Sequence, residues 1–241
     1  MIKLIASDMD GTLLNDNHII SEENLKAIRK AQERGRHFTI VTGRDYPAVK
    51  PTLDEYNLRC ECILNNGAEY RDIDGGVVES IPMNKESVKK IFDVLNRENL
   101  CIQFMTSNGT YSSNKEGDKK AIAERFKMFN PNLSEKEAIE FMEKLYRERG
   151  MKFVDDVYEV LNSDIQILKI ITFHKDEKLI AKLKEEFKEN TSDVAVASTF
   201  SNDIEMSHIE AQKGLILAKA IKKLGIDKSE VIVLGDSFND Y

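Results

Sequence analysis

The sequence contains few cysteines: Cys60, Cys62 and Cys101 are the only three in 241 residues. An odd number of cysteines without framework spacing argues against a set of disulfide bonds and favours the reducing cytosol. A metal site at Cys60 and Cys62 would need a second Cys or His pair at ligand spacing, and the sequence has no such pair. We therefore expect the cysteines to pack as small apolar side chains within strands.

Long apolar runs are absent as well. No stretch approaches the roughly 20 apolar residues that span a bilayer, so we expect no membrane partner. The apolar residues 2–6 run directly into acidic residues, with neither the basic start nor the cleavage site of a signal peptide. Together with the cysteines, this pattern predicts a cytoplasmic protein.

Internal repeats and low-complexity linkers are also missing, and the content of 41% hydrophobic and 32% charged residues is typical of a globular chain. The length allows one large domain or two small ones. The net charge of −7 argues against a nucleic-acid partner, because phosphate contacts need a basic face. A small anionic ligand remains compatible, since a bound metal ion and one or two basic side chains can reverse the local field.

The N-terminal part alternates strand and helix signals. The expected elements are a strand at 2–6, a helix that Ser21 caps and Gly35 ends, a strand at 37–41, a helix near 46–56 and a strand at 62–64. This β-α-β-α-β order predicts a parallel sheet with right-handed crossovers.

The pattern changes after this segment. Asp74-Gly75-Gly76 indicates a hairpin turn, and from about Pro82 the chain is helix-rich and charged, with strand-like segments near 101–106, 166–173 and 193–200. The alternation of helix and strand signals returns only near the end of the sequence, with a helix that ends at Gly225 and a strand at 231–234.

We therefore predict an α/β fold with a doubly wound, parallel-sheet (Rossmann-like) core. Residues 1–82 and 207–241 would form this core, and residues 83–206 an inserted α+β domain. An insertion after a core strand, at the ligand-binding edge of the sheet, is a natural place for a domain that covers the substrate.

The first chemical motif, Asp8-Met9-Asp10-Gly11-Thr12-Leu13, follows the first apolar strand. The strand period puts Asp8 and Asp10 on one side. Two close carboxylates repel unless a cation lies between them, which predicts a Mg²⁺ site. One carboxylate can attack phosphorus, and the other can protonate the leaving oxygen and later activate water. A turn-forming Asp pair is the alternative, but the whole motif directly after a strand is far more specific than two aspartates alone.

Two further segments carry weaker signals. Thr42-Gly43-Arg44 ends the second strand, where a hydroxyl and exposed N–H groups can hold phosphate oxygens; by itself it could be a strand-terminating turn. Lys213 opens the last helix, where an ammonium group can neutralise a phosphoryl group; by itself it could be a solvated surface lysine.

The last motif, Gly235-Asp236-Ser237-Phe238-Asn239-Asp240, follows the strand at 231–234. Its carboxylates would complete an oxygen-rich Mg²⁺ shell at the carboxyl ends of the strands. The alternative is an Asx-rich surface turn.

In this order, the four segments resemble the four motifs of the haloacid dehalogenase-like phosphatase superfamily. Asn65-Asn66-Gly67-Ala68, followed by a hairpin and a long insertion, resembles the Cof-type branch with its large α+β cap domain. The resemblance implies that Asp8 is the nucleophile and a metal ligand. It also implies that Asp10 is the general acid and base and binds metal through its backbone carbonyl.

The resemblance assigns roles to the remaining site residues. Thr42 and Gly43 would hold the phosphoryl group, Lys213 would pair with Asp8 and the phosphate, and Asp236 would ligate Mg²⁺. The residues with supporting roles are Asp240 near the metal, Asn239 near the phosphate, Asn66 at the boundary of core and cap, and Arg44 in the phosphate-binding motif.

These assignments predict a Mg²⁺-dependent phosphomonoester hydrolase that acts on small phosphorylated metabolites, sugar phosphates foremost, through a phosphoaspartyl intermediate. Two alternatives stay open: phosphomutase-type phosphoryl transfer, and a non-catalytic regulator that binds a phosphometabolite or metal. The resemblance further implies a monomer or a weak homo-oligomer.

The sequence departs from the family pattern at two places. It stops at Tyr241, one residue past the fourth motif. Relatives usually continue for roughly another 25–30 residues, without which we expect an exposed apolar edge next to the metal site. The segment before Lys213 also lacks the usual Pro and Gly and contains His208, which we expect to be packed or solvent-facing rather than catalytic.

Overall fold

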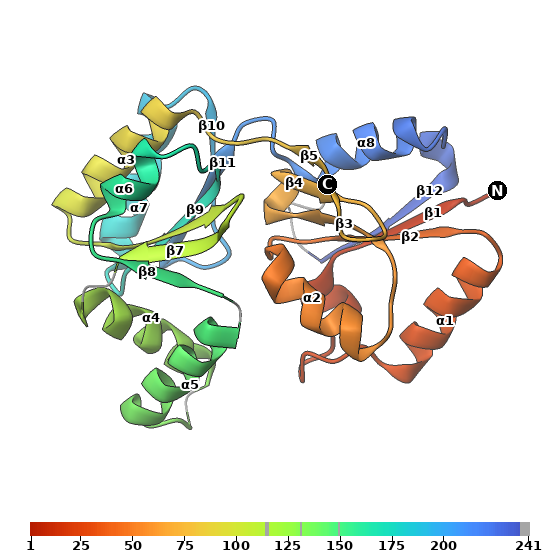
Figure 1. Ribbon diagram of the computed structural model, residues 1–241, viewed down its shortest axis with the longest axis horizontal. Helices are drawn as coiled ribbons and strands as arrows, with labels where there is room; N and C mark the ends of the chain where they lie inside the picture. Colours follow the sequence, from red (N-terminus) through yellow and green to blue (C-terminus); the bar gives the residue numbers. More distant parts are fainter. Residues whose placement is uncertain (114–115, 131, 149, 237–241) are drawn as a thin grey trace. The chain divides into compact units, whose positions relative to one another are not determined.

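The computed structural model describes residues 1–113, 116–130, 132–148 and 150–236 (Figure 1). The chain forms two compact units. The first unit combines Met1–Ile81 with Glu210–Tyr241, and the second unit is Pro82–Ile209. The sequence-based boundaries, at 82 and 207, lie close to these bounds.

The first unit contains a six-stranded sheet in the order β12-β1-β2-β3-β4-β5. Its strands are β1 (Leu4–Ser7), β2 (His37–Val41), β3 (Glu61–Leu64), β4 (Glu69–Arg71), β5 (Val77–Ser80) and β12 (Val231–Leu234). The strands from β12 to β3 pair in parallel, whereas β4 and β5 pair antiparallel. The expected parallel core is confirmed, and the predicted hairpin extends the same sheet and makes it mixed.

Helices cover both faces of this sheet. The helices are α1 (Glu22–Glu33), α2 (Tyr46–Glu55) and α8 (Lys213–Lys223). Ile28 of α1 and Val49 of α2 pack into one apolar cluster with Ile40 of β2. Ile216 of α8 packs into a separate cluster with Leu4 of β1. The arrangement is the predicted doubly wound one (Figure 1).

The boundaries of α1 show why sequence reasoning finds such elements. The Ser21 hydroxyl accepts a hydrogen bond from the Asn24 N–H at 3.1 Å, which satisfies one of the free donors of the first turn. Gly35 follows the helix with a φ of 70°, the left-handed conformation that glycine adopts without strain. Both signals are local, so they can be read without knowledge of the tertiary structure.

The second unit contains another six-stranded sheet, in the order β10-β11-β9-β6-β7-β8. Its strands are β6 (Cys101–Thr106), β7 (Gly109–Ser113), β8 (Lys152–Val154), β9 (Ile167–Phe173), β10 (Val194–Ala197) and β11 (Asp203–His208). Its helices are α3 (Lys85–Arg97), α4 (Glu116–Phe129), α5 (Glu135–Glu148), α6 (Val157–Asn162) and α7 (Glu177–Asn190). The pairs are antiparallel except for β7 with β8, which is consistent with the predicted α+β class.

The predicted strand-like segments do not include β7, β8 or β11 of this sheet. The expected strand at 193–200 is only β10, and β11 follows it as a separate strand; β8 is also not anticipated. β11 begins with Asp203, which is fully buried and accepts a hydrogen bond from the Arg125 guanidinium at 2.9 Å. Asp203 also accepts hydrogen bonds from the N–H groups of Thr199 and Phe200 at 3.0 and 3.2 Å, so the buried carboxylate is satisfied by local donors and by one distant cation.

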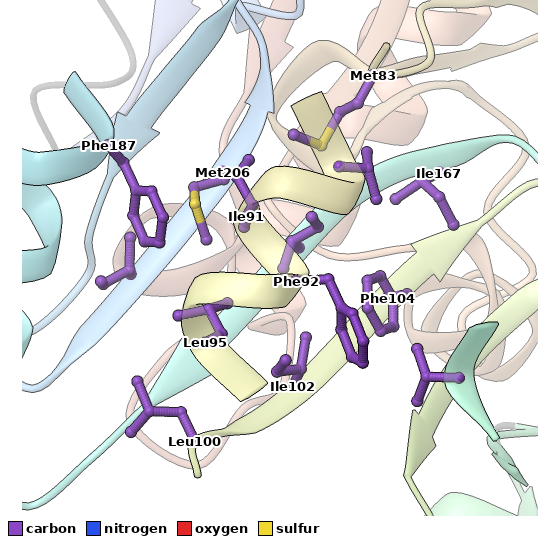
Figure 2. Close-up of a cluster of buried hydrophobic side chains, with 14 of the residues drawn as sticks. Met83, Ile91, Phe92, Leu95, Leu100, Ile102, Phe104, Ile167, Phe187 and Met206 are labelled. Atoms are coloured by element: carbon purple, nitrogen blue, oxygen red, sulfur yellow. The ribbon is translucent and has the colours of Figure 1, made fainter. Parts of the chain in front are cut away.

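The largest apolar cluster of the second unit lies between its sheet and the helices α3, α6 and α7. Figure 2 shows Ile91, Phe92 and Leu95 of α3 directed toward Phe104 and Met206 of the sheet. This cluster gives the second unit a core of its own, as expected for an inserted domain.

All three cysteines are buried, and none of them forms a disulfide bond. The hydrogen bond with Cys62, and then burial, raise the pKa of the Cys60 thiol well above its usual value. The prediction that these residues pack as small apolar side chains is confirmed. Within the described ranges, no helix is long and apolar enough to cross a membrane.

Candidate active site

Asp8 lies directly beyond the carboxyl end of β1. Its N–H donates to the carbonyl of Leu234 on β12 at 2.9 Å, and its side chain is buried, with 7% exposure of the residue. The chain then turns sharply over Met9–Leu13, where Gly11 has a φ of 78°. The turn closes with a hydrogen bond from the Leu13 N–H to the Asp8 carbonyl at 3.2 Å. The chain therefore turns away from the sheet directly after Asp8, and the Asp8 carboxylate stays at the carboxyl end of β1.

Lys213 reaches this carboxylate from the start of α8. Its Nζ lies 2.7 Å from Asp8 Oδ1, and both residues are buried. The structure thus brings together two residues that are 205 positions apart in the sequence. A charge pair with little access to water interacts strongly, and an ammonium group at the amino end of a helix is well placed to attract a further anion.

The turn Asn65–Gly67 after β3 contacts two of the predicted segments, Thr42–Arg44 and the segment that leads to Lys213. The Asn66 N–H donates to the Thr42 carbonyl at 3.1 Å, and the Asn65 N–H donates to the Arg44 carbonyl at 2.9 Å. Gly67 has a φ of 103°, and its Cα packs against Gln212, the residue before Lys213. Asn66, which was expected to lie at the boundary of core and cap, therefore helps to hold the segment Thr42–Arg44. The neighbouring Gly67 lies against the residue before Lys213.

Gly67→Ala is expected to lower the free energy of unfolding by about 2–4 kcal/mol, because alanine adds left-handed strain and a clash. A Cβ at position 67 would lie 2.6 Å from the backbone carbon of Gln212. Gly35→Ala is the matched control: its φ is also positive, at 70°, but nothing lies within 4 Å of the added Cβ. Urea denaturation of both variants measures the difference, and equal losses would contradict the role of the Gln212 contact.

Thr42 lies just past the end of β2, next to the strand that leads to Asp8. It is 1% exposed, and its N–H donates to the Ile63 carbonyl at 2.8 Å. Its hydroxyl oxygen accepts a hydrogen bond from the Arg44 N–H at 3.2 Å. The hydroxyl hydrogen can therefore be donated to a phosphoryl oxygen, in keeping with the expected role of Thr42 and Gly43.

Arg44 makes a contact that the sequence did not reveal. Its guanidinium group forms a two-pronged ion pair with Asp10: Nε lies 2.9 Å from Oδ2, and Nη2 lies 2.6 Å from Oδ1. The prediction counted Arg44 among the phosphate-binding residues, whereas here its guanidinium holds the carboxylate assigned as general acid and base.

His18 also lies near Asp10, with its Nδ1 3.9 Å from Asp10 Oδ1. It has a φ of 57°, uncommon for a residue with a side chain, in a tight loop where its N–H donates to the Asn15 carbonyl at 2.8 Å. Sequence reasoning missed this residue. The only signal was a histidine in an Asn- and Asp-rich loop soon after the first motif.

Asp236 follows β12, the strand that pairs with β1. The Thr12 hydroxyl donates to Asp236 Oδ1 at 3.4 Å, and a Cβ at Gly11 would overlap the Asp236 carboxylate. Glycine at position 11 thus leaves the space in which the Asp236 carboxylate lies against the first motif. The predicted residues Asn239 and Asp240 lie outside the described residues.

The oxygen atoms at this edge are of the kind that magnesium prefers. Asp8 and Asp236 place carboxylates beyond two adjacent strands, and Arg44 holds both oxygens of the Asp10 side chain. Across the described part of the chain, no group of three or more His, Cys, Asp and Glu side chains is placed to hold a metal. Mg²⁺ typically uses only one or two carboxylates and keeps several waters, so this smaller set suits it.

A cavity of about 250 Å³ adjoins the site. Asp8 and Lys213 line it together with mostly apolar residues of α8 and β12. Ile232, Val233 and Leu234 of β12 are each at least 40% exposed. Among the described residues, this edge of the sheet therefore carries exposed apolar side chains next to the site.

Comparison with known proteins gives consistent results. A family model described as haloacid dehalogenase-like hydrolase matches residues 5–241. Phosphatase YwpJ of Bacillus subtilis is 30% identical, and the match spans 99% of this chain and 85% of YwpJ. The 5-amino-6-(5-phospho-D-ribitylamino)uracil phosphatase YwtE of Bacillus subtilis is 31% identical, with coverage of 99% and 83%. Among solved structures, a haloacid dehalogenase-like hydrolase from B. subtilis superposes with a TM-score of 0.82 at 30% identity, covering 99% of this chain and 85% of its own.

Proposed function

The chain belongs to the haloacid dehalogenase-like hydrolase family, and from this premise we propose that it is a Mg²⁺-dependent phosphatase of small phosphorylated metabolites. Phosphatase activity follows from its relatives, whereas the metal, the substrate class and the phosphoaspartyl route are our proposals. The observation that carries them is the buried pair of Asp8 and Lys213, 2.7 Å apart, at the carboxyl end of β1. A buried carboxylate held by a cation is a prepared nucleophile for a phosphate ester.

The first half-reaction transfers the phosphoryl group to the protein. An Asp8 oxygen attacks phosphorus as the bond between phosphorus and the ester oxygen breaks. That bond's electron pair stays on the leaving oxygen, which takes a proton from the Asp10 carboxyl group. Lys213 and the Thr42 hydroxyl donate hydrogen bonds to the phosphoryl oxygens, and bound Mg²⁺ would neutralise part of their negative charge.

The second half-reaction restores the protein. Asp10, now a carboxylate, accepts a proton from a water molecule as that water attacks phosphorus. The bond between phosphorus and the Asp8 oxygen breaks, its electron pair returns to Asp8, and inorganic phosphate leaves. Lys213 then pairs with Asp8 again, as in the structure described here.

The relatives and the site together support the proposed substrate class. YwtE is named for a substrate that carries its phosphate on a ribityl chain. By analogy, we propose phosphates of sugars and of their open-chain alcohols as the class for this chain. The negative net charge and a phosphate site of few cations suit a small monoester better than a polyanion.

Phosphate release from a panel of monoesters tests the proposal. The panel contains sugar phosphates, polyol phosphates, nucleotides and p-nitrophenyl phosphate, each assayed with Mg²⁺ and with EDTA. We expect turnover that requires Mg²⁺ and is fastest with the sugar and polyol phosphates. Turnover that persists in EDTA would contradict the metal requirement, and isomerisation of a sugar phosphate without phosphate release would favour a phosphomutase.

A further inference from the structure

Another cavity, of about 350 Å³, lies in the first unit at the end of the sheet opposite to Asp8. His37 and Glu61, the first residues of the parallel strands β2 and β3, are among the residues that line it. Thr42 and the rest of the candidate active site lie past the carboxyl ends of these strands. A ligand in this cavity would therefore not occupy the phosphate site.

Apolar side chains form part of the lining. Phe38 and Cys60 are each 4% exposed, and Ile73, in the turn between β4 and β5, is half-exposed. Sites for small molecules typically combine such a lining with a few fixed polar groups in a volume of at least about 300 Å³. The cavity meets the size and the apolar part of this description.

Glu61 supplies a carboxylate that the fold holds in place. Its Oε1 accepts a hydrogen bond from the Tyr70 hydroxyl at 2.9 Å, and its Oε2 accepts one from the Thr39 hydroxyl at 3.4 Å. Burial, and then the charge of Glu61, raise the pKa of the Tyr70 hydroxyl, which therefore keeps its proton and remains a donor. Nδ1 of His37 lies 4.0 Å from Oε2, beyond hydrogen-bond distance. Since each carboxylate oxygen can accept a second hydrogen bond, Glu61 can still receive a donor from the cavity.

Arg36 supplies the opposite charge. Its backbone is fixed, because its N–H donates to the Ala31 carbonyl at 3.0 Å. Its guanidinium group donates to the sulfur of Met1 at 2.8 Å, a weak acceptor on a residue that is 89% exposed. Among the ion pairs of the described residues, none involves Arg36, whereas Arg59, the other arginine at the cavity, pairs with Asp74. An arginine of this kind can bind a ligand carboxylate through two parallel hydrogen bonds.

We propose that this cavity binds a small zwitterion with an apolar side chain, which is the chemistry of an apolar α-amino acid. Arg36 would bind the carboxylate of the ligand and Glu61 its ammonium group. Phe38, Cys60 and Ile73 would contact its side chain. Because the cavity offers both signs of charge, it suits a ligand with both signs better than a doubly negative phosphate ester.

Isothermal titration calorimetry of the full chain tests the proposal, with L-leucine, L-methionine and L-phenylalanine as probes. The amino acid that binds most tightly is then compared with two analogues, one without the carboxylate and one without the ammonium group. With the parent chain, we expect each analogue to bind at least about tenfold more weakly, because a charge-assisted contact is lost. No binding of any of the three amino acids would overturn the proposal.

Two variants assign the contacts. In Arg36→Gln, the amino acid and the analogue without the carboxylate should bind within about twofold of each other. In Glu61→Gln, which can still accept from Tyr70, the same should hold for the analogue without the ammonium group. Arg34→Gln is the matched control, because Arg34 is exposed and does not line the cavity, and it should bind all probes as the parent does. A preference for the amino acid that persists unchanged in either variant would contradict the assigned contact and overturn the proposal.

Competition with phosphate separates this cavity from the candidate active site. Saturating inorganic phosphate with Mg²⁺ should leave the Kd of the amino acid within about twofold, because the two ligands bind at opposite ends of the strands. Mutually exclusive binding would place the amino acid beside Asp8 and Lys213 and would also overturn the proposal. Since calorimetry needs no turnover, the outcome is independent of whether the chain is a phosphatase.

Discussion

Asp8→Asn is expected to reduce phosphate release by roughly 10⁴-fold or more, the largest effect of any single substitution in this chain. An asparagine amide has nearly the shape of the carboxylate, and its oxygen can still accept the hydrogen bond from Lys213. It is a far weaker nucleophile toward phosphorus, so the first half-reaction stops. The measurement is kcat with Mg²⁺ on the best ester of the panel.

Asp16→Asn is the matched control for this prediction. Asp16 lies in the exposed loop that follows the first motif, so the same chemical change there should leave kcat within about twofold. Acid quenching of the parent chain during turnover of an ester with a radiolabelled phosphoryl group should leave label on the protein, and Asp8→Asn should carry none. An Asp8→Asn protein that keeps more than a few per cent of parental activity would rule out Asp8 as the nucleophile.

Lys213→Met is expected to lower kcat by about 10²- to 10³-fold, the range seen when one group that stabilises the transition state is removed. Methionine keeps the length and apolar stem of lysine but leaves the Asp8 carboxylate buried without its cation. An unpaired buried charge is costly, so the free energy of unfolding should also fall, by about 3 kcal/mol. Kinetics and urea denaturation of the same preparation measure both effects.

Lys219→Met on the same helix controls for the loss of a lysine. Lys219 forms an ion pair with Glu79 at 2.7 Å, but its side chain is 51% exposed. Such exposed pairs contribute about 0–1 kcal/mol, so this variant should keep parental activity and nearly parental stability. If Lys213→Met behaved like Lys219→Met, Lys213 would have no part in either the reaction or the stability of the site.

The places of the candidate site residues in the fold could be predicted from sequence because these residues adjoin local signals. Asp8, Thr42 and Asp236 each follow a short apolar run, and parallel strands bring their carboxyl ends to one edge. Lys213 was identified only by its place in the resemblance, because a lysine at the start of a helix carries no signal of burial. Its contact with Asp8 depends on how α8 packs against the sheet.

The partners of the polar side chains could not be predicted in the same way. The sequence offered a phosphate as the partner of Arg44, whereas the folded chain pairs it with Asp10. Gly67 lies close to the backbone of Gln212, which is 145 positions away in the sequence. No residue near Gly67 in the sequence indicates this contact. In the second unit, the cation that pairs with the buried Asp203 of β11 is Arg125 of a distant helix.

For this protein, the doubly wound core and the inserted unit could be predicted from the sequence by itself, and the same signals led to the proposals for the nucleophile and the metal donors. These features depend on hydrophobic periodicity, on glycine and capping positions and on short motifs, all of which act over a few residues. The resemblance already implied the pair of Lys213 with Asp8, whereas only the tertiary structure decided that Arg44 holds the carboxylate of Asp10. Ion pairs between distant segments depend on how strands and helices pack, and a sequence lists the charges without the distances between them.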